Sequence, residues 1–208
     1  MIVGGLLLGA VYALFSSGLT LIWGMMNVVN FAHGDFVMLA MYVAFWTWAI
    51  LGGGPLLFTP LAAFALAVLG IVVYFGVVKP VMGGPMLAQM LGTFGLALFL
   101  RYSAFWAFTA NFRTLPEDMI PGSFVFLNVR FEAAKVVAGI VALLLTIGLH
   151  LLLTRTRLGS RMLAVSEDRQ AAMLMGIRPD RMQAIAWALA AGATGVAGAL
   201  IATFLYFS

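Results

Sequence analysis

Long runs of apolar residues alternate along the chain with short breaks that are polar or rich in glycine and proline. A bilayer core about 30 Å thick requires about 20 mostly apolar residues in a spanning helix. Six runs approach or exceed that length, at residues 2–26, 36–51, 56–78, 86–108, 136–153 and 182–208. Helices are expected because a helix satisfies its own backbone in lipid, and the sequence lacks the alternating strands of a membrane barrel. The pattern predicts an all-α fold, a polytopic transmembrane helix bundle.

Composition agrees with a membrane location. The chain has 208 residues, of which 64% are hydrophobic and 9% charged, against roughly 45–50% and 25% in soluble domains. Six spans with short connections use the whole length, so we expect a single transmembrane domain over residues 1–208. The absence of cysteine excludes disulfides, thiolate metal sites and cysteine nucleophiles.

The distribution of charge predicts the orientation. Six of the eleven basic residues lie in the loop 154–181, and short loops rich in arginine remain in the cytoplasm. Alternation then places residues 79–85 in the cytoplasm and residues 27–35 towards that side. The break at 52–55 and the mixed loop 109–135 face outside.

Small residues recur at helix-packing spacing in the first and sixth runs. Gly5 and Gly9 are four residues apart, as are Ala191, Gly195 and Ala199. Such faces let helices approach closely, so they predict packing within the bundle and carry no information about a solute.

Three polar residues interrupt the first two apolar runs without a hydrophilic loop around them: Asn30, His33 and Asp35. Such groups are costly in lipid and usually face a cavity or a partner helix. One interpretation is a tight turn in which Asp35 or Asn30 caps the second helix. The other is a broken helix whose polar groups line the solute path of a transporter.

The cytoplasmic loop contains a candidate surface helix. Ala171, Ala172, Leu174 and Met175 give it an apolar stripe, and Gly176 is placed to end it. One interpretation holds this helix on the bilayer surface through arginines and anionic lipid. The other makes it a docking helix for a cytoplasmic partner, moving as one unit over residues 164–177.

Catalytic motifs are missing. The sequence has no G-x-x-x-x-G-K-[ST] loop and so no P-loop for ATP. Ser16, Ser17, His33 and Asp35 lack the G-x-S-x-G elbow of a hydrolase, and His33 and His150 lack metal-ligand spacing. We expect a non-enzymatic transport protein without cofactor or metal, driven by energy from elsewhere.

Two separated motifs carry a family resemblance. Residues 18–24 (GLTLIWG) run into 30–35 (NFAHGD), and the loop adds 157–161 (RLGSR), Glu167-Asp168, Ala171-Ala172 and 174–177 (LMGI). Together they resemble the permease subunits of branched-chain amino acid ABC transporters, specifically the permease that carries Asn-Phe-Ala-His-Gly. The resemblance covers nearly the whole chain, although the family's chains run longer at both ends, so this sequence resembles a fragment or a truncated form.

The resemblance implies an importer of the bacterial inner membrane that moves apolar amino acids by alternating access. Its expected partners are a second related permease, two ATP-binding cassette ATPases, a periplasmic solute-binding protein and membrane lipid, with no nucleic acid. ABC importers carry Glu-Ala-Ala, three residues and then Gly in this loop, and Gln stands here in place of that Glu. The coupling residues implied are Glu167, Gln170, Ala171, Ala172 and Gly176.

Two alternatives remain open. A urea or short-amide permease of the same superfamily shares both motifs. A passive channel or a scaffold is the alternative from another class, and binding of an ATPase to the loop 154–181 distinguishes it from an importer.

Overall fold

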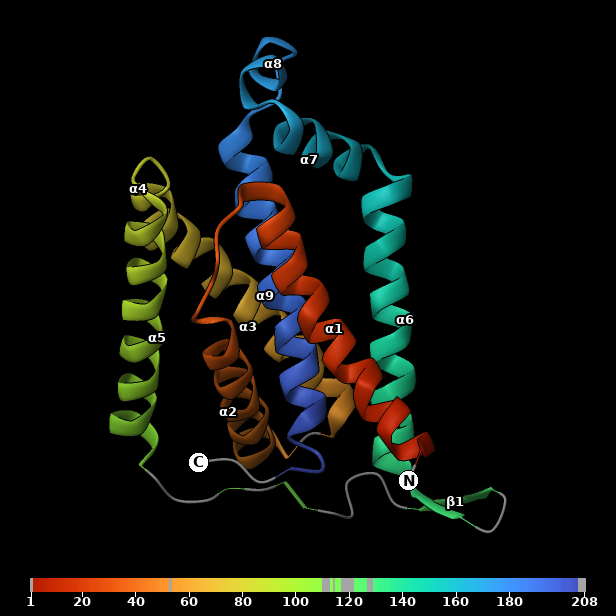
Figure 1. Ribbon diagram of the computed structural model, residues 1–208. Helices are drawn as coiled ribbons and strands as arrows, with labels where there is room; N and C mark the ends of the chain where they lie inside the picture. Colours follow the sequence, from red (N-terminus) through yellow and green to blue (C-terminus); the bar gives the residue numbers. More distant parts are fainter. Residues whose placement is uncertain are drawn as a thin grey trace.

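The computed structural model describes residues 2–52, 54–109, 113, 115–116, 122–126 and 129–205. In this part of the chain six helices are long and apolar enough to cross a membrane. They are α1 (Ile2–Met26), α2 (His33–Leu51), α3 (Pro55–Val73) with its continuation to Val81, α5 (Met86–Phe108), α6 (Ala133–Arg155) and α9 (Pro179–Ile201). They form one bundle (Figure 1). The predicted all-α polytopic fold is confirmed.

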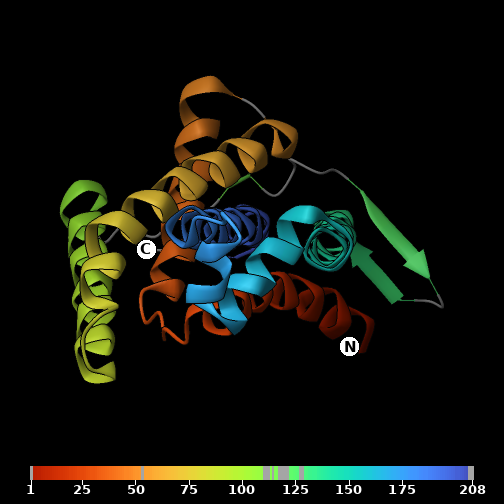
Figure 2. The ribbon, with the colours of Figure 1, turned by 90° about the horizontal axis from the view of Figure 1, so that it is seen from above.

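Helix α9 is the centre of the bundle. Seen from above, α1, α2 and α3 surround it, while α5 stands at one edge (Figure 2). Small residues allow this close packing, since a Cβ added at Gly195 would lie 2.7 Å from the Ala62 carbonyl, and one at Gly70 2.6 Å from that of Trp187. In contrast, a Cβ at Gly5 or Gly9 would meet nothing within 4 Å. The predicted small-residue packing therefore holds for α9 but not, within this chain, for the start of α1.

The third span continues further than the sequence predicts. After α3 comes a π-helix, η1 (Tyr74–Val78), and then one turn, α4 (Lys79–Val81). Pro80 has no N–H for the usual backbone bond, and the wider π-turn comes directly before it. Residues 79–81 were expected to lie in a turn and are helical, so the actual turn is confined to Met82–Pro85.

One end of the bundle carries two further helices, α7 (Arg157–Glu167) and α8 (Arg169–Leu174). The turn after α4 lies at this same end, as alternation requires (Figure 1). We call it the cytoplasmic end, following the predicted orientation. Helix α7 runs across this end between α6 and α8 (Figures 1 and 2).

The connection from α1 to α2 turns back into the bundle. Asn27 has a φ of 53°, and the chain then descends without helix until α2 begins about midway between the two ends (Figure 1). Val28 and Ala32 are buried in this stretch and hold it against the core. Residues 27–35 were all expected towards the cytoplasmic side. That expectation is wrong for the second half of the segment, because its buried apolar residues draw it inward.

The opposite end carries a small hairpin that the sequence did not predict. β1 (Ser123–Phe126) pairs antiparallel with β2 (Val129–Glu132), with Ser123 opposite Glu132. The hairpin falls inside the predicted outer loop 109–135, of which residues 110–112, 114, 117–121 and 127–128 lie outside the described residues.

The last span is shorter than predicted. The apolar run extends to 208, but α9 ends at Ile201 because tight turns follow, in which Thr203 donates to the Leu200 carbonyl and the Phe204 N–H to that of Ile201. Residues 206–208 lie outside the described part.

Candidate functional site

His33 joins three helices in the middle of the bundle. Its Nε2 lies 3.0 Å from the Phe15 carbonyl of α1 and 3.3 Å from Thr194 Oγ1 of α9. A carbonyl only accepts, so Nε2 carries the proton and donates. The ring is 2% exposed and lies 4.6 Å, centre to centre, from the Phe15 ring. His33 therefore holds the first turn of α2 between α1 and α9.

Asn30 folds the descending segment instead of capping a helix. Its Oδ1 accepts from the Ala32 N–H at 3.1 Å, and α2 has no side-chain cap. The carbonyl of the preceding residue, Val29, accepts a hydrogen bond from the Thr93 hydroxyl of α5 at 2.9 Å. The predicted capping role is thus wrong for Asn30, because it lies two residues before Ala32, the residue at the N-cap of α2.

Asp35 forms an ion pair with Arg101 of α5. Oδ1 of Asp35 accepts from Arg101 Nε at 3.1 Å and lies 3.1 Å from Nη2. The Asp35 side chain is 5% exposed and that of Arg101 62%. Asp35 therefore fixes α2 to α5 and does not cap the helix, because it lies inside the first turn with its carboxylate turned to another span.

The predicted coupling helix is two helices, with Asp168 between them. Oδ1 of Asp168 accepts from the N–H groups of Gln170 and Ala171, at 2.8 and 2.9 Å, and so caps α8. A single helix over 164–177 is therefore wrong, since this carboxylate competes for the backbone donors and starts a new helix.

The five expected coupling residues lie between the last residue of α7 and the turn that follows α8. Glu167, Gln170 and Ala171 are exposed, while Ala172 is 3% exposed and packs inward. Gly176 has a φ of 77°, a left-handed conformation that follows the last residue of a helix. The apolar stripe is divided as a result. Ala172 faces the bundle, and Leu174 and Met175 project outward at 90% and 82% exposure.

An ion-pair network fixes α8 to the spans. Asp180, at the start of α9, accepts from Lys79 Nζ at 2.7 Å and from Arg169 Nη2 at 2.9 Å. One turn along α9, Gln183 accepts from the buried Tyr74 hydroxyl at 2.8 Å. Arg169 of α8 is thus linked through Asp180 of α9 to Lys79 of α4, and the Tyr74–Gln183 bond links η1 to α9.

Comparison with known proteins identifies the family of this chain. The family model described as the permease component of branched-chain amino acid transport systems matches residues 1–207. The chain belongs to this family. The permease is thus a multi-pass membrane protein of a transport system, and the predicted family and transport role are confirmed.

Several curated relatives are similar to the permease. The high-affinity branched-chain amino acid transport system permease protein BraD of Pseudomonas aeruginosa is 30% identical, over 96% of this chain and 69% of its own. The probable branched-chain amino acid transport permease protein LivH of Methanocaldococcus jannaschii is 28% identical, over 95% of this chain and 64% of its own. The LivH protein of Salmonella typhimurium is also 28% identical, over 96% of this chain and 69% of its own. No solved structure matches the chain.

Sequence reasoning did not assign the partners of the permease's polar residues. Arg101, Thr194 and Asp180 each complete a contact with a residue far away in the chain. For Arg101 a signal existed, because a charge inside an apolar span requires a partner. For Thr194 there was none, since threonine is common in membrane helices and commonly bonds its own backbone.

Proposed function

We propose that this chain is the permease subunit of an ATP-binding cassette importer that carries branched-chain or other apolar amino acids across the bacterial inner membrane. The observation that carries the proposal is the family match over residues 1–207. The names of the relatives, from a bacterium and an archaeon, support the solute class.

Helix α8 supports an ATP-driven mechanism. Leu174 and Met175 are more exposed than most apolar residues of this chain, and such a patch indicates a protein contact. The alternative, a helix lying on the bilayer, fits less well, because α8 projects beyond the ends of the spans and beyond α7 (Figure 1). We infer that α8 docks on an ATPase subunit.

The remaining partners follow from the importer class: a second related permease, a pair of ATPases and a periplasmic binding protein. Gln170 stands where the class carries glutamate, so docking uses the apolar end of α8 and not an ion pair there. In this scheme ATP binding moves α8, and the Asp180 network transmits the movement to α9 and η1.

The proposed role of Asn30, His33 and Asp35 in the solute path remains a prediction. All three are at most 5% exposed. In this conformation protein groups hold them, so contact with a solute requires α2 or α5 to move.

The test is reconstitution of the permease with its partner subunits in vesicles. ATP hydrolysis is measured with leucine-loaded, urea-loaded and empty binding protein. Stimulation by leucine is expected, whereas stimulation by urea alone would reassign the solute. Stable permease without an associated ATPase would overturn the importer assignment.

A matched pair of variants tests the docking surface. Leu174→Glu should abolish co-purification of the ATPase, since it charges the exposed apolar end of α8. Leu87→Glu, on an exposed leucine at the start of α5 at the same end, should leave co-purification unchanged.

A further inference from the structure

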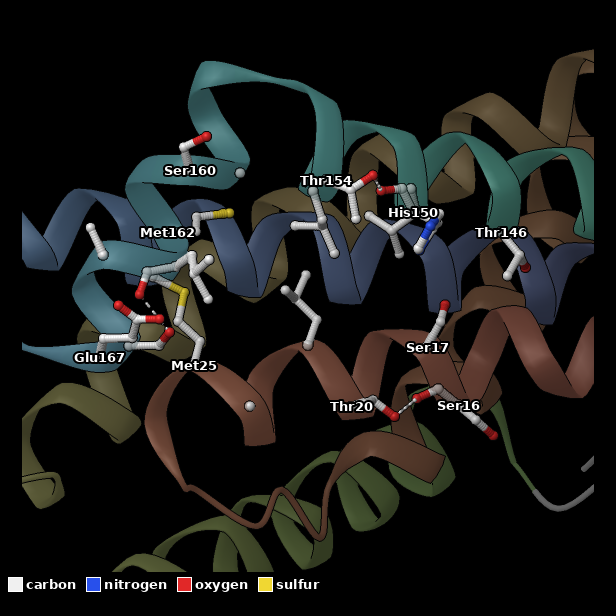
Figure 3. Close-up of a pocket in the computed structure, with 18 of the residues that line it drawn as sticks. Ser16, Ser17, Thr20, Met25, Thr146, His150, Thr154, Ser160, Met162 and Glu167 are labelled. Atoms are coloured by element: carbon white, nitrogen blue, oxygen red, sulfur yellow. Dashed lines mark hydrogen bonds between the residues drawn. The ribbon is translucent and has the colours of Figure 1, made fainter.

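A groove of about 1050 Å³ lies between α1, α6 and α7. We propose that this groove binds the transported amino acid on the cytoplasmic half of its path. The inference rests on the proposed function and adds to it the place where the solute is held. Ser17 of α1 faces Thr146 and His150 of α6 across the groove (Figure 3).

The groove carries more polar side chains than other exposed faces of the bundle. Seven hydroxyl groups line it, on Ser16, Ser17, Thr20, Thr146, Thr154, Ser160 and Ser166, together with His150 and Glu167. The exposed face of α3, by contrast, carries apolar side chains such as Leu61, Phe64 and Val72. Polar groups inside a membrane face a cavity or a partner, because hydrocarbon offers them no hydrogen bonds. This greater polarity favours contact of this side of α1 and α6 with water or a solute.

The groove offers acceptors for an ammonium group. Ser17, Thr20 and Thr146 each donate to a carbonyl of their own helix, at 2.7, 2.9 and 2.8 Å. With their hydrogens used, these hydroxyls present only lone pairs to the groove. An α-ammonium group donates three hydrogen bonds and matches such a surface.

Donors for a carboxylate also line the groove. Within the described part of the chain, neither the Ser16 hydroxyl nor the His150 ring has a hydrogen-bonding partner. Both remain free to donate to an anion. Zwitterion recognition requires acceptors and donors within one small site, and this groove supplies them.

Apolar side chains complete the site. Leu21 of α1 and Leu149 and Leu153 of α6 line the same groove. Ligand sites typically combine mostly apolar walls with a few placed polar groups in about 300–1,000 Å³. The groove therefore has the chemistry for a small zwitterion with a branched apolar side chain, and room for water around it.

The groove is connected to the proposed site of energy input. It occupies the half of α1 that leads to Met26, and α7 closes its cytoplasmic end through Leu163 and Glu167. Only Asp168 separates α7 from α8. Movement of α8 by an ATPase therefore also moves the groove's cytoplasmic wall, which opens or closes the site.

The absence of cysteine makes a direct test possible. Ser16→Cys and Thr146→Cys introduce single thiols into the groove of the fully assembled transporter. Ile147→Cys is the matched control, on the neighbouring, exposed position of α6 that does not line the groove. A membrane-impermeant cationic thiol reagent is applied to the cytoplasmic side of inside-out vesicles, without ATP.

The groove thiols should react at least about tenfold faster than Ile147→Cys, since the thiolate forms in water. Leucine at about ten times its dissociation constant should slow their labelling about tenfold, because about one site in eleven is then empty. Thiols that label only in the isolated chain would show that the second permease covers the groove, and would overturn the inference.

Failure of the inference is distinguishable from failure of the proposed function. If the assembly transports leucine but leucine does not protect the groove thiols, the inference falls and the function stands. If the parent assembly does not transport leucine, the proposed function itself falls.

A second pair of variants tests the groove by filling it. A side chain at Gly24, which lines the groove, or at Gly148, which does not, would meet nothing within 4 Å. Gly24→Leu should lower leucine uptake at least about tenfold through loss of solute binding. Gly148→Leu should leave uptake unchanged, and equal uptake by the two variants would contradict the proposal.

Discussion

At the scale of single residues, the polar groups in the middle of the bundle each connect one helix to another. His33 connects α2 to α1 and α9, and Asp35 connects α2 to α5. The Phe15 carbonyl that His33 binds directly precedes Ser16 and Ser17 of the groove. The motif that identified the family therefore supports the groove wall from behind.

Replacement of His33 tests this supporting role. His33→Ala removes the donor to the Phe15 carbonyl, worth about 1 kcal/mol in a typical hydrogen bond, and leaves a void. We expect less assembled transporter and lower uptake, both measured per unit of membrane protein. His33→Gln retains an N–H donor and should recover most of both. A changed solute selectivity with normal assembly would instead support the prediction that His33 lines the path.

The Asp35–Arg101 pair predicts non-additive stabilities. Arg101→Leu leaves a buried carboxylate without its partner and should destabilise the permease by about 2 kcal/mol, below the usual cost for a fully buried pair because the Arg101 side chain is mostly exposed. The double variant with Asp35→Asn removes the stranded charge and should be more stable than Arg101→Leu alone. Thermal unfolding in detergent measures the stability of the single and the double variant. Equal stabilities of these two variants would show that the ion pair contributes nothing.

At the scale of elements, the sequence predicted which segments span the membrane better than where they begin. Length and lack of charge identified all six spans, because a bilayer imposes both. The start of α2 was missed because it depends on packing by Val28 and Ala32 and on Thr93 from a distant helix. No local pattern encodes such contacts. The candidate residues His33 and Asp35 were found by their cost in lipid, but their partners were not.

Gly176 offers a test of helix α8 as a rigid docking element. Its φ of 77° costs about 1–2 kcal/mol for an ordinary L-residue. Gly176→Val should displace the end of α8 and lower leucine uptake relative to ATP hydrolysis, with normal membrane insertion. Gly176→Asn is the matched control, because asparagine tolerates this conformation. Unchanged coupling in Gly176→Val would contradict the role of α8.

At the scale of the whole molecule, the charge distribution predicts the orientation on which the proposed function depends. Seven of the eleven basic residues lie at the end that carries α7 and α8: Lys79 and the six of the loop 154–181. The ion pairs of Asp180 with Lys79 and Arg169 join both charged segments there. Arg113 and Arg130 belong to the opposite loop, and Lys135 lies in the first turn of α6 at that end. The positive-inside rule therefore predicts that α8 lies in the cytoplasm, where ATPases act.

Single cysteines in the cysteine-free chain test this orientation. In intact cells an impermeant thiol reagent should label Glu132→Cys, at the end of β2, and leave Gly83→Cys unlabelled until the inner membrane is opened. Gly83 is exposed in the turn after α4, and a side chain there meets nothing within 4 Å. Gly83 precedes α5 and Glu132 follows the loop after it, so the two positions lie on opposite sides of the membrane. The reagent should therefore label only one of them from a given side. The reverse pattern would place α8 outside the cell, where it meets no ATPase, and would exclude the importer mechanism even though the fold remained correct.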